Sequence, residues 1–133
     1  MKVMVFAFDT KAESAYMPHN CQRDSVVYTG THDTPTFLQW LREGEAESTI
    51  YARRYLRLRD DEGLCWGVIA GAWACPSRLA IAPLQDVLGL GADARMNTPG
   101  TQGSHNWSWR VRVEAFNPFV SGKLRELNRI YRR

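Results

Sequence analysis

The sequence lacks a long hydrophobic run, a cysteine pattern and an internal repeat, and each absence excludes a class of protein. The longest apolar stretch, Leu64 to Cys75, is too short to span a bilayer, and no charged leader precedes an apolar segment. The three cysteines match no zinc or disulfide spacing, which is typical of a reduced setting. We therefore expect a cytoplasmic protein with no membrane partner, in which Cys65 and Cys75 are small core residues.

A single sign of charge is also lacking, because the net charge is only +3 in 133 residues. Arginines between residues 42 and 59 alternate with acidic residues between 43 and 61, a mixture typical of a solvated helix surface. We therefore expect no nucleic-acid partner. The composition, 44% hydrophobic and 23% charged, leaves room for one globular core.

Three short segments predict strands. Lys2 to Phe8, KVMVFAF, is almost continuously hydrophobic, as in strands that are covered on both faces. Ser25 to Thr29 is rich in good strand formers, and Leu79 to Ala82 is apolar and ends at Pro83. The segment between the first two strands, Asp9 to Gln22, is polar and irregular, which favours a loop over a crossover helix.

Apolar side chains at helical spacing, together with capping and breaking residues, predict the helices. They are Thr34 to about Arg42, ending near Gly44; Glu45 or Ala46 to about Arg59; Leu64 to Cys75, apolar nearly all round and packed against a sheet; a single turn over Leu84 to Gly89; and Ser121 to Tyr131. Ala92 to Asn106 is predicted to be loop. The order predicts an α/β chain with a small parallel sheet, whose open edges favour self-association.

The candidate site begins in the run Val27 to Thr36, VYTGTHDTPT. A strand leads directly into His32 and Asp33, and Thr34-Pro35 is a favourable N-cap followed by proline at the first helical position. His32 and Asp33 are therefore predicted at the carboxyl end of a strand, where parallel α/β proteins collect their ligands.

A second group of polar residues follows the third predicted strand. Gln85 and Asp86 come directly after it, and Arg95 and Asn97 lie close behind. An alternative interpretation assigns Asp33 to helix capping and Asp86 to a first helical turn, and residue spacing alone leaves both interpretations open.

Five strings occur in this order along the chain: MKVMVFAF, MPHN, VVYTGTHDTPT, APLQDVLGLGADARMNTPG and NWSWR. In order and spacing they resemble those of the amylomaltases, the 4-alpha-glucanotransferases of bacteria and plants. That family has a (β/α)8 barrel. The resemblance implies that residues 1–133 are a single partial domain, the C-terminal portion of such a TIM barrel with about strands six to eight, and incomplete as an isolated chain.

The resemblance also implies a reaction that uses no metal and no organic cofactor. Family enzymes cleave an α-1,4-glucosidic bond and pass the glucan to an acceptor sugar with retained configuration, which requires a nucleophilic and an acid/base carboxyl group. In the family these are an Asp after the fourth strand and a Glu after the fifth, and neither segment occurs in this sequence. We therefore expect an α-1,4-glucan or maltooligosaccharide ligand and no transferase activity from the isolated chain. The alternative is a catalytically dead glucan-binding or accessory module.

The resemblance assigns expected roles residue by residue. Asp33 resembles the acidic residue that stabilises the distorted sugar in the transition state, and His32 resembles its neighbour on the same sugar. Asn97 and Pro99 resemble residues on the acceptor side, and Phe8 resembles an apolar platform near the site. The remaining candidates are expected to be barrel-end scaffold or substrate contacts: Gln85, Asp86, Arg95, Asn106, Trp107 and Trp109. Trp66 and Trp73 are predicted to pack in the core.

Overall fold

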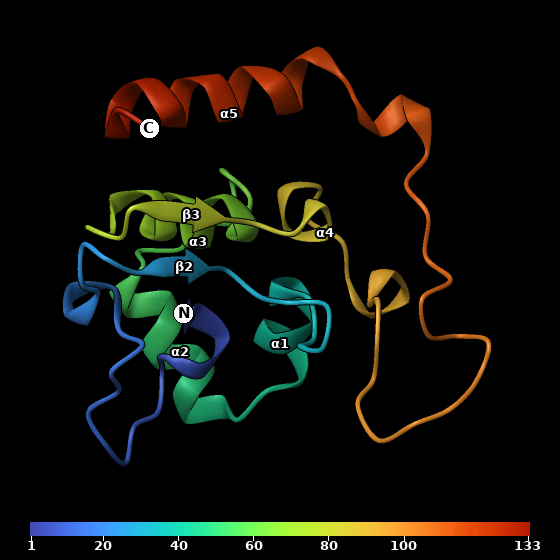
Figure 1. Cartoon of the computed structure of the whole chain (residues 1–133), viewed down its shortest axis with the longest axis horizontal. Coiled ribbons are helices and arrows are strands. Elements are labelled where there is room, and N and C mark those ends of the chain that lie inside the picture. Colours follow the sequence, from blue (N-terminus) through green and yellow to red (C-terminus); the bar gives the residue numbers. More distant parts are fainter.

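The computed structural model describes residues 1–133 and is built around a three-stranded parallel sheet. The strands are β1 (Lys2–Val3), β2 (Val26–Tyr28) and β3 (Leu79–Ile81), in the order β1-β2-β3. Lys2 and Ala80 flank Val27 on either side of the central strand. Because the strands are parallel, their carboxyl ends lie along one edge of the sheet, and the arrows of β2 and β3 point the same way (Figure 1).

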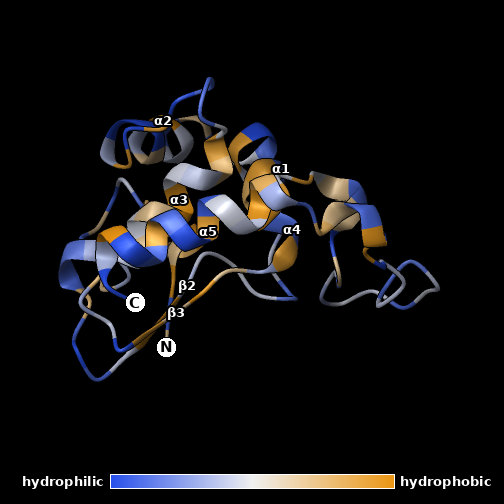
Figure 2. Ribbon diagram, turned by 90° about the horizontal axis from the view of Figure 1, so that it is seen from above, coloured by the Kyte–Doolittle hydropathy of each residue, from blue (hydrophilic) through white to orange (hydrophobic).

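Five α-helices accompany the sheet. They are α1 (Phe37–Glu43), α2 (Ala46–Tyr55), α3 (Leu64–Ala74), α4 (Leu84–Val87) and α5 (Pro118–Tyr131), with 3-10 turns at Met4–Phe6, Pro18–Asn20, Ala92–Ala94 and Val113–Ala115. The first three helices form the crossover from β2 to β3. Figure 2 shows the helices on one side of the strands, so no helix covers the opposite face of the sheet. None of the helices combines the length and hydropathy needed to cross a bilayer.

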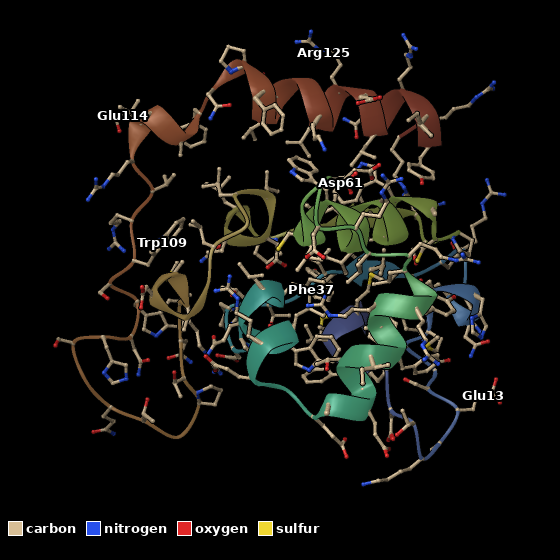
Figure 3. All side chains as sticks on the ribbon, turned by 180° about the vertical axis from the view of Figure 1, so that it is seen from behind. Glu13, Phe37, Asp61, Trp109, Glu114 and Arg125 are labelled. Atoms are coloured by element: carbon tan, nitrogen blue, oxygen red, sulfur yellow. The ribbon has the colours of Figure 1, made fainter.

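The core lies between the sheet and the crossover helices. Val27 from the central strand, Phe37 from α1 and Ile69 from α3 are all completely buried there. Figure 3 shows Phe37 in the interior of the molecule. The buried side chains of α3 recur at helical spacing on one side of the helix: Cys65, Val68, Ile69 and Ala72.

Helix α5 packs on the outside of this core through the partly buried Val120, Leu124 and Leu127, and it passes over α3 (Figure 1). None of its residues is fully buried, and a hollow of about 680 Å³ lies between part of α5, α3 and the end of α2. Polar contacts join the two helices, because the indole N–H of Trp73 donates to Asn128 Oδ1 at 2.7 Å. The guanidinium of Arg133 donates to the carbonyl oxygens of Trp73 at 2.7 Å, of Ser77 at 2.9 Å and of Cys75.

The structure corrects two predicted element boundaries at the amino-terminal half. The predicted strand Lys2 to Phe8 is wrong beyond Val3, where a 3-10 turn over Met4–Phe6 follows. Met4 and Val5 are buried in that turn. The apolar run therefore indicates that these residues are buried, but it does not distinguish a strand from a turn. The first predicted helix begins at Phe37 because Thr36 is the N-cap in place of Thr34, and its Oγ1 accepts from the Gln39 N–H at 3.2 Å.

Two further helix ends differ. The second predicted helix ends at Tyr55, well before Arg59, and Arg57 adopts φ +53° in the turn that follows. Helix α5 begins at Pro118, before the predicted Ser121, because Asn117 caps it by accepting from the Val120 N–H. The remaining strands, α3, the short α4 and the loop after residue 92 are confirmed to within a few residues.

Candidate functional site

His32 and Asp33 lie on the loop that leaves β2, at the carboxyl edge of the sheet, as predicted. The loop closes on itself, because the Thr31 N–H donates to Thr34 Oγ1 at 2.9 Å and that hydroxyl donates to the Thr31 carbonyl oxygen at 3.1 Å. The side chains of His32 and Asp33 remain 57% and 49% exposed. The turn therefore presents an imidazole and a carboxylate to solvent.

Asp86 holds the two ends of this loop. It is only 1% exposed, and its carboxylate accepts the Thr29 hydroxyl at 2.6 Å and the Phe37 backbone N–H at 2.8 Å. Thr29 precedes the His32-Asp33 turn and Phe37 follows it, so one buried group fixes both. Burial raises the pKa of Asp86, whereas the bonds from Thr29 and Phe37 act to lower it.

A second loop, after the 3-10 turn Ala92–Ala94, closes on Asp33. Asn97 Nδ2 donates to Asp33 Oδ1 at 2.6 Å, and the Asn97 N–H donates to the His32 carbonyl oxygen at 3.1 Å. The Arg95 guanidinium donates to the carbonyl oxygens of Asp33 and Asn97, both at 2.9 Å. His32 Nε2 lies 3.3 Å from the other oxygen of Asp33. Neighbours on both oxygens fix the direction of this carboxylate.

Trp107, one of the residues expected to be barrel-end scaffold or a substrate contact, also reaches the site. Its ring centroid lies 5.2 Å from that of His32, and the residue is 54% exposed. The Trp107 N–H donates to the Met96 carbonyl oxygen at 2.7 Å, and its φ is +62°. Asn106 helps to fold the loop back, since its Oδ1 accepts from the Thr98 N–H at 3.0 Å. The position of Trp107 in the string NWSWR does not indicate that its ring is exposed.

Two further residues expected to be scaffold or substrate contacts, Gln85 and Trp109, and the expected acceptor-side residue Pro99 lie around these loops. Gln85 is buried and donates through Nε2 to the Ala94 carbonyl oxygen at 3.2 Å. Trp109 lies on the segment that leads away from the site and accepts through its carbonyl oxygen from Arg110 (Figure 3). Pro99 is exposed at the tip of the loop that follows Asn97.

The structure does not bring Phe8 to this cluster. Phe8 is 1% exposed, and its ring centroid lies 5.9 Å from Trp40, 6.0 Å from Tyr51 and 5.9 Å from Tyr55. A sugar can stack only on an exposed ring face. Phe8 therefore presents no ring face on which a sugar could stack.

The cysteines lie away from this chemistry. All three are buried, and burial raises the pKa of Cys65 and of Cys75 to about 12. Thiols with such pKa values are inert at neutral pH, as predicted for core residues. No group of three or more His, Cys, Asp or Glu side chains is arranged to hold a metal ion.

The arrangement is suited to binding hydroxyl groups. Asp33 offers acceptors, His32 and Asn97 offer polar nitrogens, and a small hollow of about 130 Å³ lies beneath the loop. Asp33 is the one carboxylate within the hydrogen-bonded cluster of His32, Asn97 and Arg95, whereas a retaining double displacement uses two carboxyl groups about 5–5.5 Å apart.

Comparison with known proteins gives a consistent result. The family model for 4-alpha-glucanotransferases of glycoside hydrolase family 77 matches residues 1–115. The 4-alpha-glucanotransferase of Clostridium butyricum is 41% identical over 100% of this chain and 27% of its own length. The chloroplastic/amyloplastic enzyme of Solanum tuberosum is 46% identical over 84% of this chain and 19% of its own length.

The structural comparison agrees. The amylomaltase from Streptococcus agalactiae, solved in complex with acarbose, superposes with a TM-score of 0.94 at 36% identity, covering 100% of this chain and 27% of that chain. The chain thus spans about a quarter of the length of these bacterial relatives. Because the plant relatives are chloroplastic or amyloplastic, the cytoplasmic location stays a prediction.

Proposed function

Because this chain belongs to the 4-alpha-glucanotransferase family, we propose that residues 1–133 form one side of the substrate site of an enzyme that transfers α-1,4-glucan segments between maltooligosaccharides. The observation that carries the proposal is the contact between Asn97 Nδ2 and Asp33 Oδ1 at 2.6 Å. It joins the loops after β2 and after β3 at the carboxyl edge of the sheet, around an exposed carboxylate.

The proposal includes the place of this chain in the fold. Strands β1, β2 and β3 are the last three strands of a (β/α)8 barrel, and the face of the sheet without helices is its interior. The parallel pairing and the one-sided helices support this assignment, since barrel helices lie outside the strands. The match to 27% of an amylomaltase chain supports it further.

Asp33 is the transition-state stabiliser in this proposal. Its carboxylate accepts hydrogen bonds from hydroxyls of the sugar at the cleavage point, and these bonds strengthen as the ring flattens and gains positive charge. Asn97 and His32 hold the carboxylate in direction, and His32 contacts the same sugar. Asn97 and Pro99 face the acceptor sugar.

Bond cleavage itself needs a nucleophile and an acid/base carboxyl group, which we assign to the part of the enzyme that these 133 residues do not span. The isolated chain is then inactive as a transferase. A second candidate, a glucan-binding or accessory module without catalysis, is favoured by the fact that the site is formed within a chain that has its own buried core.

The test is a chimera in which residues 1–133 replace the matching segment of the Clostridium butyricum enzyme, assayed by glucose release from maltotriose. We expect transfer in the chimera and a loss of at least about 100-fold in Asp33→Ala, because a transition-state contact is removed. Asp60→Ala, an exposed aspartate in the turn between α2 and α3, is the matched control. Unaltered turnover in Asp33→Ala contradicts the proposal.

The isolated chain separates the two candidates. Maltotriose that binds in calorimetry without any glucose release supports a binding role for this chain alone. Glucose release well above background overturns the assignment of the two catalytic carboxyl groups to another segment.

A further inference from the structure

Trp107 exposes a large apolar ring beside the polar groups of the site. More than half of the residue is accessible to solvent, whereas the core aromatics Phe8 and Phe37 are essentially inaccessible. Unlike Trp73, whose indole N–H donates to Asn128, Trp107 makes its hydrogen bonds through its backbone.

The loop holds the backbone of Trp107 in place with several contacts. The Trp107 N–H donates to Met96, its carbonyl oxygen accepts from the Arg110 guanidinium at 2.9 Å, and its backbone adopts φ +62°. A bulky residue seldom occupies this left-handed region, because its side chain crowds the backbone there. The backbone of Trp107 is thus held in one position, so the exposure of its ring does not result from a loose loop.

The ring shares its framework with the sugar-binding groups. The imidazole of His32 lies 5.2 Å from the indole centroid at an interplanar angle of 39°, which covers only part of the ring. The segment 95–98 contacts Asp33, His32 and Trp107 at once, through Asn97 and Met96. His32, which contacts both the Asp33 carboxylate and the indole, therefore places the two groups side by side.

A glucose ring has the complementary chemistry. Its hydroxyl groups need hydrogen-bonding partners such as Asp33 and His32, while its C–H groups form apolar patches that pack on a flat aromatic face. Resting on the function proposed above, we infer that Trp107 is the aromatic platform of a sugar subsite adjoining Asp33, and that its ring stacks on a glucose unit of a bound α-1,4-glucan.

Binding measurements on the 133-residue chain test this inference. Calorimetry with maltotriose and with maltoheptaose should give about tenfold weaker binding for Trp107→Ala, because a stacking surface is lost. Trp107→Phe, which keeps a flat ring, should recover most of the affinity. Trp66→Phe, on α3 and away from the site, is the matched control and should bind as the wild type does.

Circular dichroism of each variant checks that the fold is kept, and fluorescence adds a direct readout. Maltoheptaose should change the tryptophan emission of the wild type and of Trp66→Phe, and this change should be lost in Trp107→Phe. Equal affinity of wild type and Trp107→Ala overturns the inference while leaving the proposed function intact. Absence of sugar binding by the isolated wild-type chain contradicts the glucan-binding module, and the effect of Trp107→Ala on KM in the chimera then decides the inference.

Kinetics of the chimera distinguish the role inferred for Trp107 from the role proposed for Asp33. Trp107→Ala should raise KM for maltotriose more than it lowers kcat, since stacking holds substrate and transition state alike, whereas Asp33→Ala should act mainly on kcat. If KM is unchanged in Trp107→Ala while Asp33→Ala is still inactive, Trp107 is not a sugar platform. The role of Asp33 as transition-state stabiliser is then kept.

Discussion

The ionisable carboxyl group of Asp86 also positions the loop that carries Asp33. Its carboxylate is buried and accepts from Thr29 and Phe37, on either side of that loop. Burial raises its pKa above the ordinary value of 3.8. The folded state therefore binds this proton more tightly than the unfolded state does.

Stability should consequently fall as pH rises through the window that opens at about 3.8 and extends up to the raised pKa of Asp86. Within this window the folded chain holds more protons than the unfolded chain, so the free energy of unfolding decreases with pH and then levels off. Asp86→Asn lacks the titrating group and should lack this slope. Urea unfolding of both proteins across the window measures the difference.

The control for that experiment is Asp86→Ala, which also removes the acceptor. It leaves the Thr29 hydroxyl and the Phe37 N–H without a partner, at a cost of about 1–3 kcal/mol for each group at every pH. A stability difference between wild type and Asp86→Asn that does not change with pH would contradict the assignment.

For individual residues, the sequence predicts the position along the secondary structure well, but it does not predict which residues become neighbours in the folded chain. His32 and Asp33 were predicted correctly at a strand end, because strand formers and turn residues lie next to each other in the chain. The burial of Phe8 among Trp40, Tyr51 and Tyr55 depends on how α1 and α2 fold over the first turn. No spacing within the sequence encodes that packing.

Among the α-helices, α5 is the one without a buried residue. Its side chains Val120, Leu124 and Leu127 are only partly buried against the core, and its hydrogen bonds to α3 run through Asn128 and the adjacent Arg133. Local stability follows the number of buried contacts, so α5 should open at a lower free energy than α3 does.

Hydrogen exchange should therefore show faster exchange of backbone amides in α5 than in α3. Asn128→Ala and Arg133→Ala should each speed exchange in α5 further, with little effect on the centre of α3. Arg129→Ala, an exposed residue of the same helix, is the control. Equal protection of the two helices in the wild type would show that α5 is not a separate unit.

The predicted elements also differ in how far sequence could define them. α3 and β2 were predicted almost to the residue, since a run from Leu64 that ends before Pro76 and a Val-rich segment have clear limits. The strand predicted over Lys2 to Phe8 shrank to Lys2–Val3, because buried turns and buried strands have the same composition. Caps such as Thr36 differ from neighbouring threonines only by backbone geometry.

The whole molecule carries an apolar sheet face without helices and two unpaired sheet edges. Leu79 and Ile81 on β3 are exposed, and they pair in register with Val26 and Tyr28 of the central strand. Such a surface favours contact with another apolar surface or strand edge. We expect the isolated chain to self-associate through it.

Sedimentation velocity over a range of protein concentrations tests this expectation. The average mass should rise with concentration in the wild type and should rise less in Leu79→Lys and Ile81→Lys, because a lysine there opposes burial of the face. Val113→Lys, which changes an exposed valine on the segment before α5, is the control. A mass that stays monomeric at all concentrations would contradict the prediction.

The bond between Asn97 and Asp33 joins residues that are 64 positions apart in the chain. Because closing so long a loop costs chain entropy before the bond forms, we expect the bond to form after the crossover helices have packed and β3 has paired in register. The site should thus be assembled after most of the secondary structure during refolding. Recovery of sugar binding would then report the final step of folding, later than the recovery of helical circular dichroism.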